Sequence, residues 1–370
     1  APAGASNNDP EGETGELELL VTDAEEDFVT YRIAINRIEL ERGDGSRVTV
    51  LPRSSEVDFV QYQELSELFA VANMPVGVYE SVTMELDYTQ AEIVVRGEQG
   101  QAVEAQVVDP DGNPVTRLDV ELTLGGVEQV VVASGRPARL TLDLDLGASN
   151  SVISQEPPVV EVEPFVLGRA LVDEDREVRV RGLLARVDEA GSAVTLSVRP
   201  MRLRGGGFGR FTFAVNEQTL YEIDGSELTG SEGLSAMAGL EIDTPVVAFG
   251  GYSDIDDTQV AERVLAGSSV AWDGRDLLRG TVRARSGNRL TLGGAVVEPQ
   301  DRAAAFLGEM TLIVDETTTV TGYPRREAGI EHLSVGSRIL ALGQFEQDSF
   351  SAQGGIVRLQ PSRWVGQVNR

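Results

Sequence analysis

Two short loops of this 370-residue sequence combine acidic and amide side chains as calcium-binding loops do. The first holds Asp109, Asp111 and Asn113, and the second holds Asp254 and Asp256. Calcium takes about six to eight oxygen ligands, and runs of Asp and Asn supply several within one loop. However, neither loop has the spacing of an EF-hand with its distal Glu, and Asp-Gly-Asn-Pro is itself a hairpin-turn signal. A calcium site and a plain turn are therefore the two interpretations of these residues.

Few other side chains of the sequence suit catalysis. The chain has one histidine and no cysteine, which excludes thiolate nucleophiles, disulfides and cysteine-ligated zinc. His332 is typical of a surface or capping residue, because no Gly-x-Ser-x-Gly elbow accompanies it. Asp143 and Asp145 share a strand face as a glycosidase pair would, but alternating acids are ordinary on the solvent face of an acidic sheet. The glycine run 205–209 lacks a P-loop lysine and favours a flexible hairpin connection. We therefore expect no enzyme and no cofactor, apart from the calcium alternative.

The charge balance narrows the classes of partner. The chain has 60 acidic and 31 basic residues, a formal net charge of −29 that would repel nucleic acid and anionic lipid. No apolar run reaches the roughly 18 to 20 residues that span a bilayer, so we expect no membrane insertion. The sequence begins Ala1-Pro2-Ala3-Gly4 instead of with Met. We expect a mature, exported product whose targeting segment was removed.

The elements that would position these residues are mostly β-strands. Residues 1–14 have the composition of a leader or linker. From Gly15 onward, apolar residues alternate with polar ones, most clearly in Leu140–Leu146. Further strands are expected over 17–21, 31–35, 47–51, 57–60, 78–88, 91–96, 102–108, 117–124 and 127–133. Only Gln63–Ala72 has helical spacing. Residues 15–172 are therefore predicted to form a β-sandwich.

An internal repeat follows the sandwich, with copies at 178–270 and 277–360. Its best match aligns Phe211–Thr219 without gaps on Met310–Thr318. Three further pairs match: Arg181–Arg186 with Arg279–Ala284, Ala193–Val198 with Arg289–Gly294, and Val246–Gly250 with Ile339–Gly343. Short alternating strands with glycine-rich turns and a small apolar total favour small closed or partly open barrels. The predicted fold class is all-β, an N-terminal β-sandwich followed by two small β-barrel-like repeats.

Residues 361–370 resemble the start of a third repeat. Within them, Trp364, Val365, Gly366, Gln367 and Val368 align with Leu278–Val282. No barrel follows this strand in the printed sequence, and we expect that it could add to an open sheet edge of a neighbouring copy. Folding back onto its own second barrel is the alternative.

Several motifs give the first 170 residues a family resemblance. They are Gly15–Ala24 with its Thr-Asp-Ala, Val57–Phe59, Gly77–Val82 with its Gly-x-Tyr turn, and Leu140–Leu146. This region resembles a bacterial domain of unknown function found in exported lipoproteins and surface proteins. The repeats resemble a second uncharacterised bacterial β-domain, often found in tandem. Neither resemblance implies a catalytic residue set. The printed sequence contains no cysteine that could carry a lipid, so a lipid anchor would need a cysteine outside it, and this question stays open.

These features together predict an exported, non-enzymatic structural protein of the bacterial cell surface. Its expected partner is a second copy of itself, and a head-to-tail filament would form if the contact does not close into a ring. The alternative is a periplasmic or surface module that binds a glycan or a divalent cation.

Overall fold

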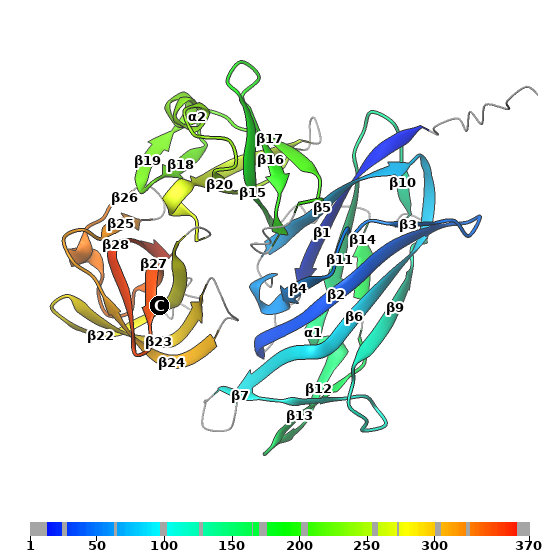
Figure 1. Ribbon diagram of the computed structural model, residues 1–370, viewed down its shortest axis with the longest axis horizontal. Helices are drawn as coiled ribbons and strands as arrows, with labels where there is room; N and C mark the ends of the chain where they lie inside the picture. Colours follow the sequence, from blue (N-terminus) through cyan, green and yellow to red (C-terminus); the bar gives the residue numbers. More distant parts are fainter. Residues whose placement is uncertain are drawn as a thin grey trace, which may run out of the picture.

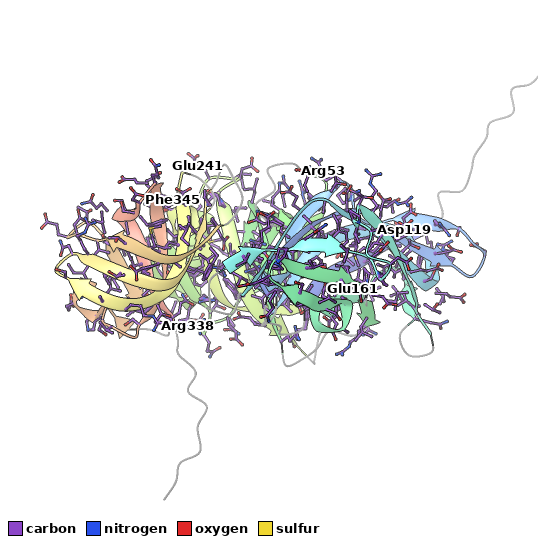
Figure 2. All side chains as sticks on the ribbon, turned by 90° about the horizontal axis from the view of Figure 1, so that it is seen from below. Arg53, Asp119, Glu161, Glu241, Arg338 and Phe345 are labelled. Atoms are coloured by element: carbon purple, nitrogen blue, oxygen red, sulfur yellow. The ribbon has the colours of Figure 1, made fainter. Side chains whose placement is uncertain are left out.

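The computed structural model describes residues 13–23, 28–62, 65–96, 102–125, 129–164, 166–169, 176–200, 206–253, 258–271, 274–299, 305–322 and 326–360. Of these residues, 67% lie in β-strands and only 8% in helices, so the all-β prediction is confirmed. Figure 1 shows three modules: a sandwich built from the first strands and two smaller barrels. Figure 2, turned by 90°, shows that the molecule is thin in the third direction. Among the described residues, no helix is long and apolar enough to cross a membrane.

The sandwich consists of two main sheets and a small third one. One main sheet has the strand order β14-β11-β1-β5, and the other is built on β10-β6-β2-β3, with β4, β7 and β9 alongside. The third sheet has the order β12-β13-β8. The elements are β1 (Thr14–Asp23), β2 (Phe28–Arg42), β3 (Arg47–Thr49), β4 (Ser55–Asp58), η1 (Phe59–Tyr62), β5 (Leu65–Pro75), β6 (Gly77–Arg96), β7 (Ala102–Glu104), β8 (Gln106–Val108), β9 (Arg117–Thr123), β10 (Val130–Val132), β11 (Ala138–Leu144), α1 (Leu146–Ser149), β12 (Asn150–Gln155), β13 (Pro158–Val162) and β14 (Val166–Arg169).

The helix expected over Gln63–Ala72 is wrong, because Leu65–Pro75 forms strand β5. This strand lies between β1 and β15, and it is buried without a break from Ser66 to Ala70. A register shift of β1 between Leu19 and Leu20 lets the ladder skip one residue of β5. A continuously buried strand has no alternation, so its apolar spacing cannot be told from that of a short buried helix.

Each barrel is a closed ring of five strands. The first ring has the order β15-β16-β17-β21-β20, and β20 pairs with β15 again. The second has the order β22-β23-β24-β28-β27, and β27 pairs with β22. The elements are β15 (Glu177–Asp188), β16 (Ala193–Val198), β17 (Arg210–Ala214), β18 (Leu220–Ile223), β19 (Ser226–Thr229), α2 (Gly230–Ala238), β20 (Pro245–Tyr252), β21 (Gln259–Ala266), η4 (Gly267–Ser269), β22 (Asp276–Ser286), β23 (Arg289–Glu298), β24 (Ala305–Ile313), β25 (Thr319–Gly322), β26 (Arg326–Glu327), η5 (Ile330–His332), β27 (Arg338–Glu346) and β28 (Ser349–Gln360).

The two rings also agree in register. Gly182 of β15 lies opposite Val246 of β20, and Gly280 of β22 lies opposite Ile339 of β27. Leu196 lies opposite Phe211 in the first barrel, as Leu292 lies opposite Met310 in the second. The residues that align in the sequence therefore occupy the same places in the two sheets.

A buried threonine fixes the turn after the third strand of each ring. Thr219 Oγ1 accepts a hydrogen bond from the Asn216 N–H at 2.9 Å and donates to the Ala261 carbonyl at 2.7 Å. Thr318 Oγ1 makes the same two bonds, to the Asp315 N–H at 3.0 Å and the Ala352 carbonyl at 2.8 Å. One hydroxyl thus satisfies two main-chain groups and joins the turn to the last strand.

The sandwich and the first barrel share one hydrophobic core, whereas the second barrel has its own. β5 pairs with β15 in parallel, so the sheet runs on from the sandwich into the barrel. The glycine run, of which residues 206–209 are described, lies at this boundary. Phe208 is buried in the shared core and its carbonyl accepts a bond from the Val71 N–H at 2.8 Å. A Cβ on Gly209, where φ is +86°, would lie 2.1 Å from the Val71 oxygen. This end of the run is therefore a docked contact and not the flexible connection that was expected.

Candidate functional site

The loop with the candidate calcium ligands forms a tight turn after β8. Asp109 Oδ1 accepts hydrogen bonds from the Asp111 N–H at 3.0 Å and the Asn113 N–H at 2.8 Å. Gly112 has a φ of +82°, as such a turn requires. These bonds, that of Asn113 first, lower the pKa of Asp109. In the described part of the chain, no group of three or more acidic or histidine side chains could hold a metal ion. The hydrogen bonds of the turn account for the position of the Asp109 carboxylate.

The other candidates are not brought together. Asp254 and Asp256 lie outside the described residues, as do Trp364, Val365, Gly366, Gln367 and Val368. His332 is exposed on η5, where its Nδ1 accepts a bond from the Gly329 N–H at 3.0 Å. Asp145 is the N-cap of α1 and accepts from the Ala148 N–H at 2.9 Å, while Asp143 lies on β11. The structure therefore gives His332 and Asp145 local capping roles.

Buried charges instead gather where the modules meet. Glu67 of β5 is fully buried and pairs with two arginines of β15, Arg179 and Arg181. The Arg181 Nε lies 2.7 Å from Glu67 Oε1, and the Arg179 Nε donates to Oε2. These arginines are two residues apart, so they lie on one face of the strand. The Arg179 guanidinium also lies 5.7 Å from the ring centre of Tyr62, within cation–π range.

A second cluster joins the same two modules. Arg139 of β11 donates to Glu18 of β1 at 2.7 Å, and the hydroxyl of Tyr252 in β20 donates to the same oxygen at 3.0 Å. The Arg139 guanidinium lies 3.7 Å from the centre of the Tyr252 ring. Burial raises the pKa of the Tyr252 phenol, and the Glu18 charge raises it further, so the phenol stays neutral and remains a donor.

The second barrel brings charges to the same junction. Arg279 of β22 pairs with Glu298 of β23, and both act electrostatically on Asp58 at the end of β4. Burial raises the pKa of Asp58, and the negative charge of Glu298 raises it further while Arg279 opposes the shift. The charge on Glu298 also acts on Arg181 of the first barrel. Groups from all three modules are therefore electrostatically coupled at one place.

The barrels are joined by a buried ion pair between Arg358 of β28 and Glu222 of β18. Arg358 Nε donates to Glu222 Oε2 at 2.8 Å, and Nη2 donates to Oε1 at 2.7 Å. Nη2 also donates to the carbonyl of Ser269 in η4, which connects the barrels. A planar guanidinium that donates two parallel hydrogen bonds to one carboxylate fixes both the distance and the relative orientation of the two side chains.

Beside this pair lies a cavity of about 250 Å³ between the barrels. Its lining includes Leu220, Glu222, Glu227, Arg263, Leu265 and Arg358. Burial raises the pKa of Glu227, and the neighbouring Glu222 raises it further. Acidic and basic groups balance in this lining, so the cavity has no strong preference for an anion or a cation.

Sequence reasoning missed all of these junction residues. Single arginines and glutamates within strands resemble solvent-facing positions, and their partners lie far along the chain: Glu222 and Arg358 are 136 residues apart. One signal in the sequence could have indicated such a buried charge: a charged residue within an apolar run of a strand, as Glu67 is beside Leu68 and Phe69.

Comparison with known proteins supports the prediction that the first part of the chain resembles an uncharacterised domain. Residues 14–156 match the model of a family described as Domain of unknown function (DUF4382). No curated protein and no solved structure gives a significant match to the chain. The family match covers the strands from β1 to β12 and ends within the sandwich.

Proposed function

We propose that this protein is an exported, non-enzymatic structural protein of the bacterial cell surface, and that copies assemble head to tail by strand donation. The observation that carries the proposal is the way the three modules are fused. A continuous sheet, a shared core and the buried pair at Glu67 hold the sandwich to the first barrel, and the buried pair at Glu222 holds the second barrel to the first. A subunit that transmits force or sets a spacing needs such fixed geometry, whereas modules joined by few contacts move relative to one another.

The repeat supports the assembly part of the proposal. We infer that both barrels derive from one module of the second uncharacterised family, because their strand order and register agree. Trp364–Val368 matches the opening strand β22, which has a partner on each side, β23 and β27. A segment with this sequence is therefore suited to pairing with further strands, and a sheet edge on another copy supplies them.

The resemblance of the first domain to exported lipoprotein and surface domains supports the location. Negative-stain microscopy of cell-surface material, with antibody labelling of the protein, tests location and assembly together. We expect labelled filaments or regular arrays outside the cell. Label confined to the cytoplasm, or label only on dispersed single molecules, would contradict the proposal.

The alternative function is a binding module for a glycan or a divalent cation. The observation in its favour is the cavity between the barrels, which is large enough for a small polar molecule. Calorimetric titration of the full chain with oligosaccharides and with calcium distinguishes the two functions, since a saturable heat at one site per chain would favour binding.

A further inference from the structure

In the described part of the chain, strand β12 has a free edge at the end of the sandwich. It is the outermost strand of the sheet β12-β13-β8, and among the described residues its only ladder partner is β13. Figure 1 shows β12 and β13 at the end of the sandwich opposite β10. The main-chain groups on the outer side of such a strand can pair with another chain.

This edge lacks charged residues, one of the usual protections against pairing. Proteins commonly place charged residues on exposed edges, since a charge disfavours the addition of a strand. β9 is the other edge strand of more than four residues in the described part of the chain, and it carries Arg117, Asp119 and Glu121. β12 consists of Asn150-Ser151-Val152-Ile153-Ser154-Gln155 and has no charged residue. In a chain with 25% charged residues, an uncharged edge stands out.

Apolar side chains on β12 also face solvent. Val152 is 46% exposed and Ile153 is 56% exposed, which places them among the few large apolar residues on the described surface. The register of β12 against β13 shifts between Val152 and Ser154, so Ile153 is the extra residue of a bulge. Val152 itself stays in the ladder, opposite Val160. A strand added beside it would cover apolar surface as well as form main-chain bonds.

We propose that β12 is the acceptor edge for Trp364–Val368 of a second copy, an inference that rests on the proposed function. Charge favours this occupant. Residues 361–370 contain two arginines, Arg363 and Arg370, and no acid, in a chain whose net charge is −29. The surroundings of β12 are acidic, with Glu156 after it and Glu161 and Glu163 on and beyond β13; Figure 2 labels Glu161. Pairing of β12 with a second β12 would instead bring these acids together.

The donor segment suits the edge in chemistry as well. If it pairs as a strand, its alternation would place Trp364 on one face and Val365 on the other, so each face would bring an apolar group to the pair. Trp364 would lie over apolar side chains of the acceptor and supply most of the buried area. The flanking arginines would then reach the acids around β13.

Cysteine cross-linking tests this contact directly, because the 370 residues of this sequence contain no cysteine. One preparation of the full chain carries Val152→Cys and another carries Val365→Cys. After mixing and mild oxidation we expect a disulfide-linked pair of chains. Val131→Cys, on the short edge strand β10 and 58% exposed, is the matched acceptor control. It should give at least a tenfold lower yield with the same donor.

A charge placed on the edge gives a second test. Val152→Lys should abolish assembly without lowering the melting temperature, and Val131→Lys should leave assembly unchanged. If wild-type assemblies form but the two cysteine acceptors cross-link equally, the acceptor is wrong and the proposed function stands. If Val152→Cys cross-links mainly with itself, β12 pairs with β12 and the proposal is overturned. If the wild type forms no assembly, the proposed function fails together with this contact.

Discussion

Arg358 in the last strand of the second barrel forms a two-bond ion pair with Glu222 of the first barrel, and each side chain is only 9% exposed. Two charges removed from water carry a large desolvation cost, which their mutual bonds offset only while both partners are present. The pair therefore ties the position of the second barrel, which has a separate core, to that of the first.

Glu222→Gln should uncouple the second barrel from the rest of the chain. The change leaves the buried guanidinium of Arg358 without a counter-charge, at a cost of about 3 to 5 kcal/mol. We expect calorimetry to show separate unfolding of the second barrel at a lower temperature. The control is Glu41→Gln, whose partner Arg47 is 57% exposed, and it should cost at most about 1 kcal/mol. An equal effect of the two changes would show that the inter-barrel pair has no special role.

Thr219→Val should destabilise the first barrel through its turn. Valine has the shape of threonine but leaves the Asn216 N–H and the Ala261 carbonyl without their partner, a loss of about 1 to 3 kcal/mol. Thr219→Ser keeps the hydroxyl and should recover part of the loss. Urea unfolding of both variants measures the difference. If valine leaves the stability unchanged while serine lowers it, the methyl group and not the hydroxyl stabilises the turn.

The same turn of the second barrel should respond to pH. Asp315 Oδ1 accepts bonds from the hydroxyl and N–H of Thr317, at 2.6 and 2.9 Å, and these lower its pKa below 3.8. A lowered folded-state pKa stabilises the protein above the unfolded pKa, and this contribution is lost as the pH falls through the folded pKa.

Asn216 occupies the matching position of the first barrel and does not titrate. Asp315→Asn should therefore lower the melting temperature at pH 7, with a difference that begins to shrink as the pH falls below about 3.9, the ordinary Asp pKa, and is lost once the pH is below the lowered folded-state pKa. Carboxyl NMR titration of Asp315 checks the direction of the pKa shift. A raised pKa, or a melting-temperature difference that grows in acid, would contradict this account.

Calcium should stabilise the protein through screening alone. With 29 excess negative charges, divalent cations relieve self-repulsion in low salt without a dedicated site. We expect a modest rise in melting temperature that disappears in added NaCl and is unchanged by Asp111→Ala or by Asp256→Ala. A response that saturates with calcium, survives NaCl and is lost on either change would establish a specific site at that loop.

The sequence predicts the strands of the fold better than it predicts the buried charge pairs at the module junctions. Short-range alternation predicts the strand expected over Leu140–Leu146, because a sheet with one buried face repeats every two residues. The strand itself, β11, ends at Leu144, and α1 begins at Leu146. Alternation fails to identify a strand that is covered on both faces, as β5 is. It also misplaces the boundaries between neighbouring strands. The two strands expected over 78–88 and 91–96 are one strand, β6, and the strand expected over 102–108 is divided at Ala105.

Helix α2 was missed for a related physical reason. Gly230–Ala238 contains two glycines in nine residues, which lowers its intrinsic helix propensity. Tertiary packing overrides that propensity: a Cβ on Gly233 would lie 2.0 Å from the Tyr221 ring, so the helix packs directly on β18 through a residue that must be small. Such long-range contacts cannot be read from local pattern.

Removal of Trp364–Arg370 tests the assembly of this protein most directly. Wild-type and truncated chains are compared at equal concentration by sedimentation velocity and negative-stain microscopy, with the melting temperature of each recorded. The account predicts that truncation abolishes polymers and leaves a folded monomer with an unchanged melting temperature. Polymers that persist while the truncated monomer becomes less stable would show that the segment folds back onto its own barrel, and would contradict strand donation.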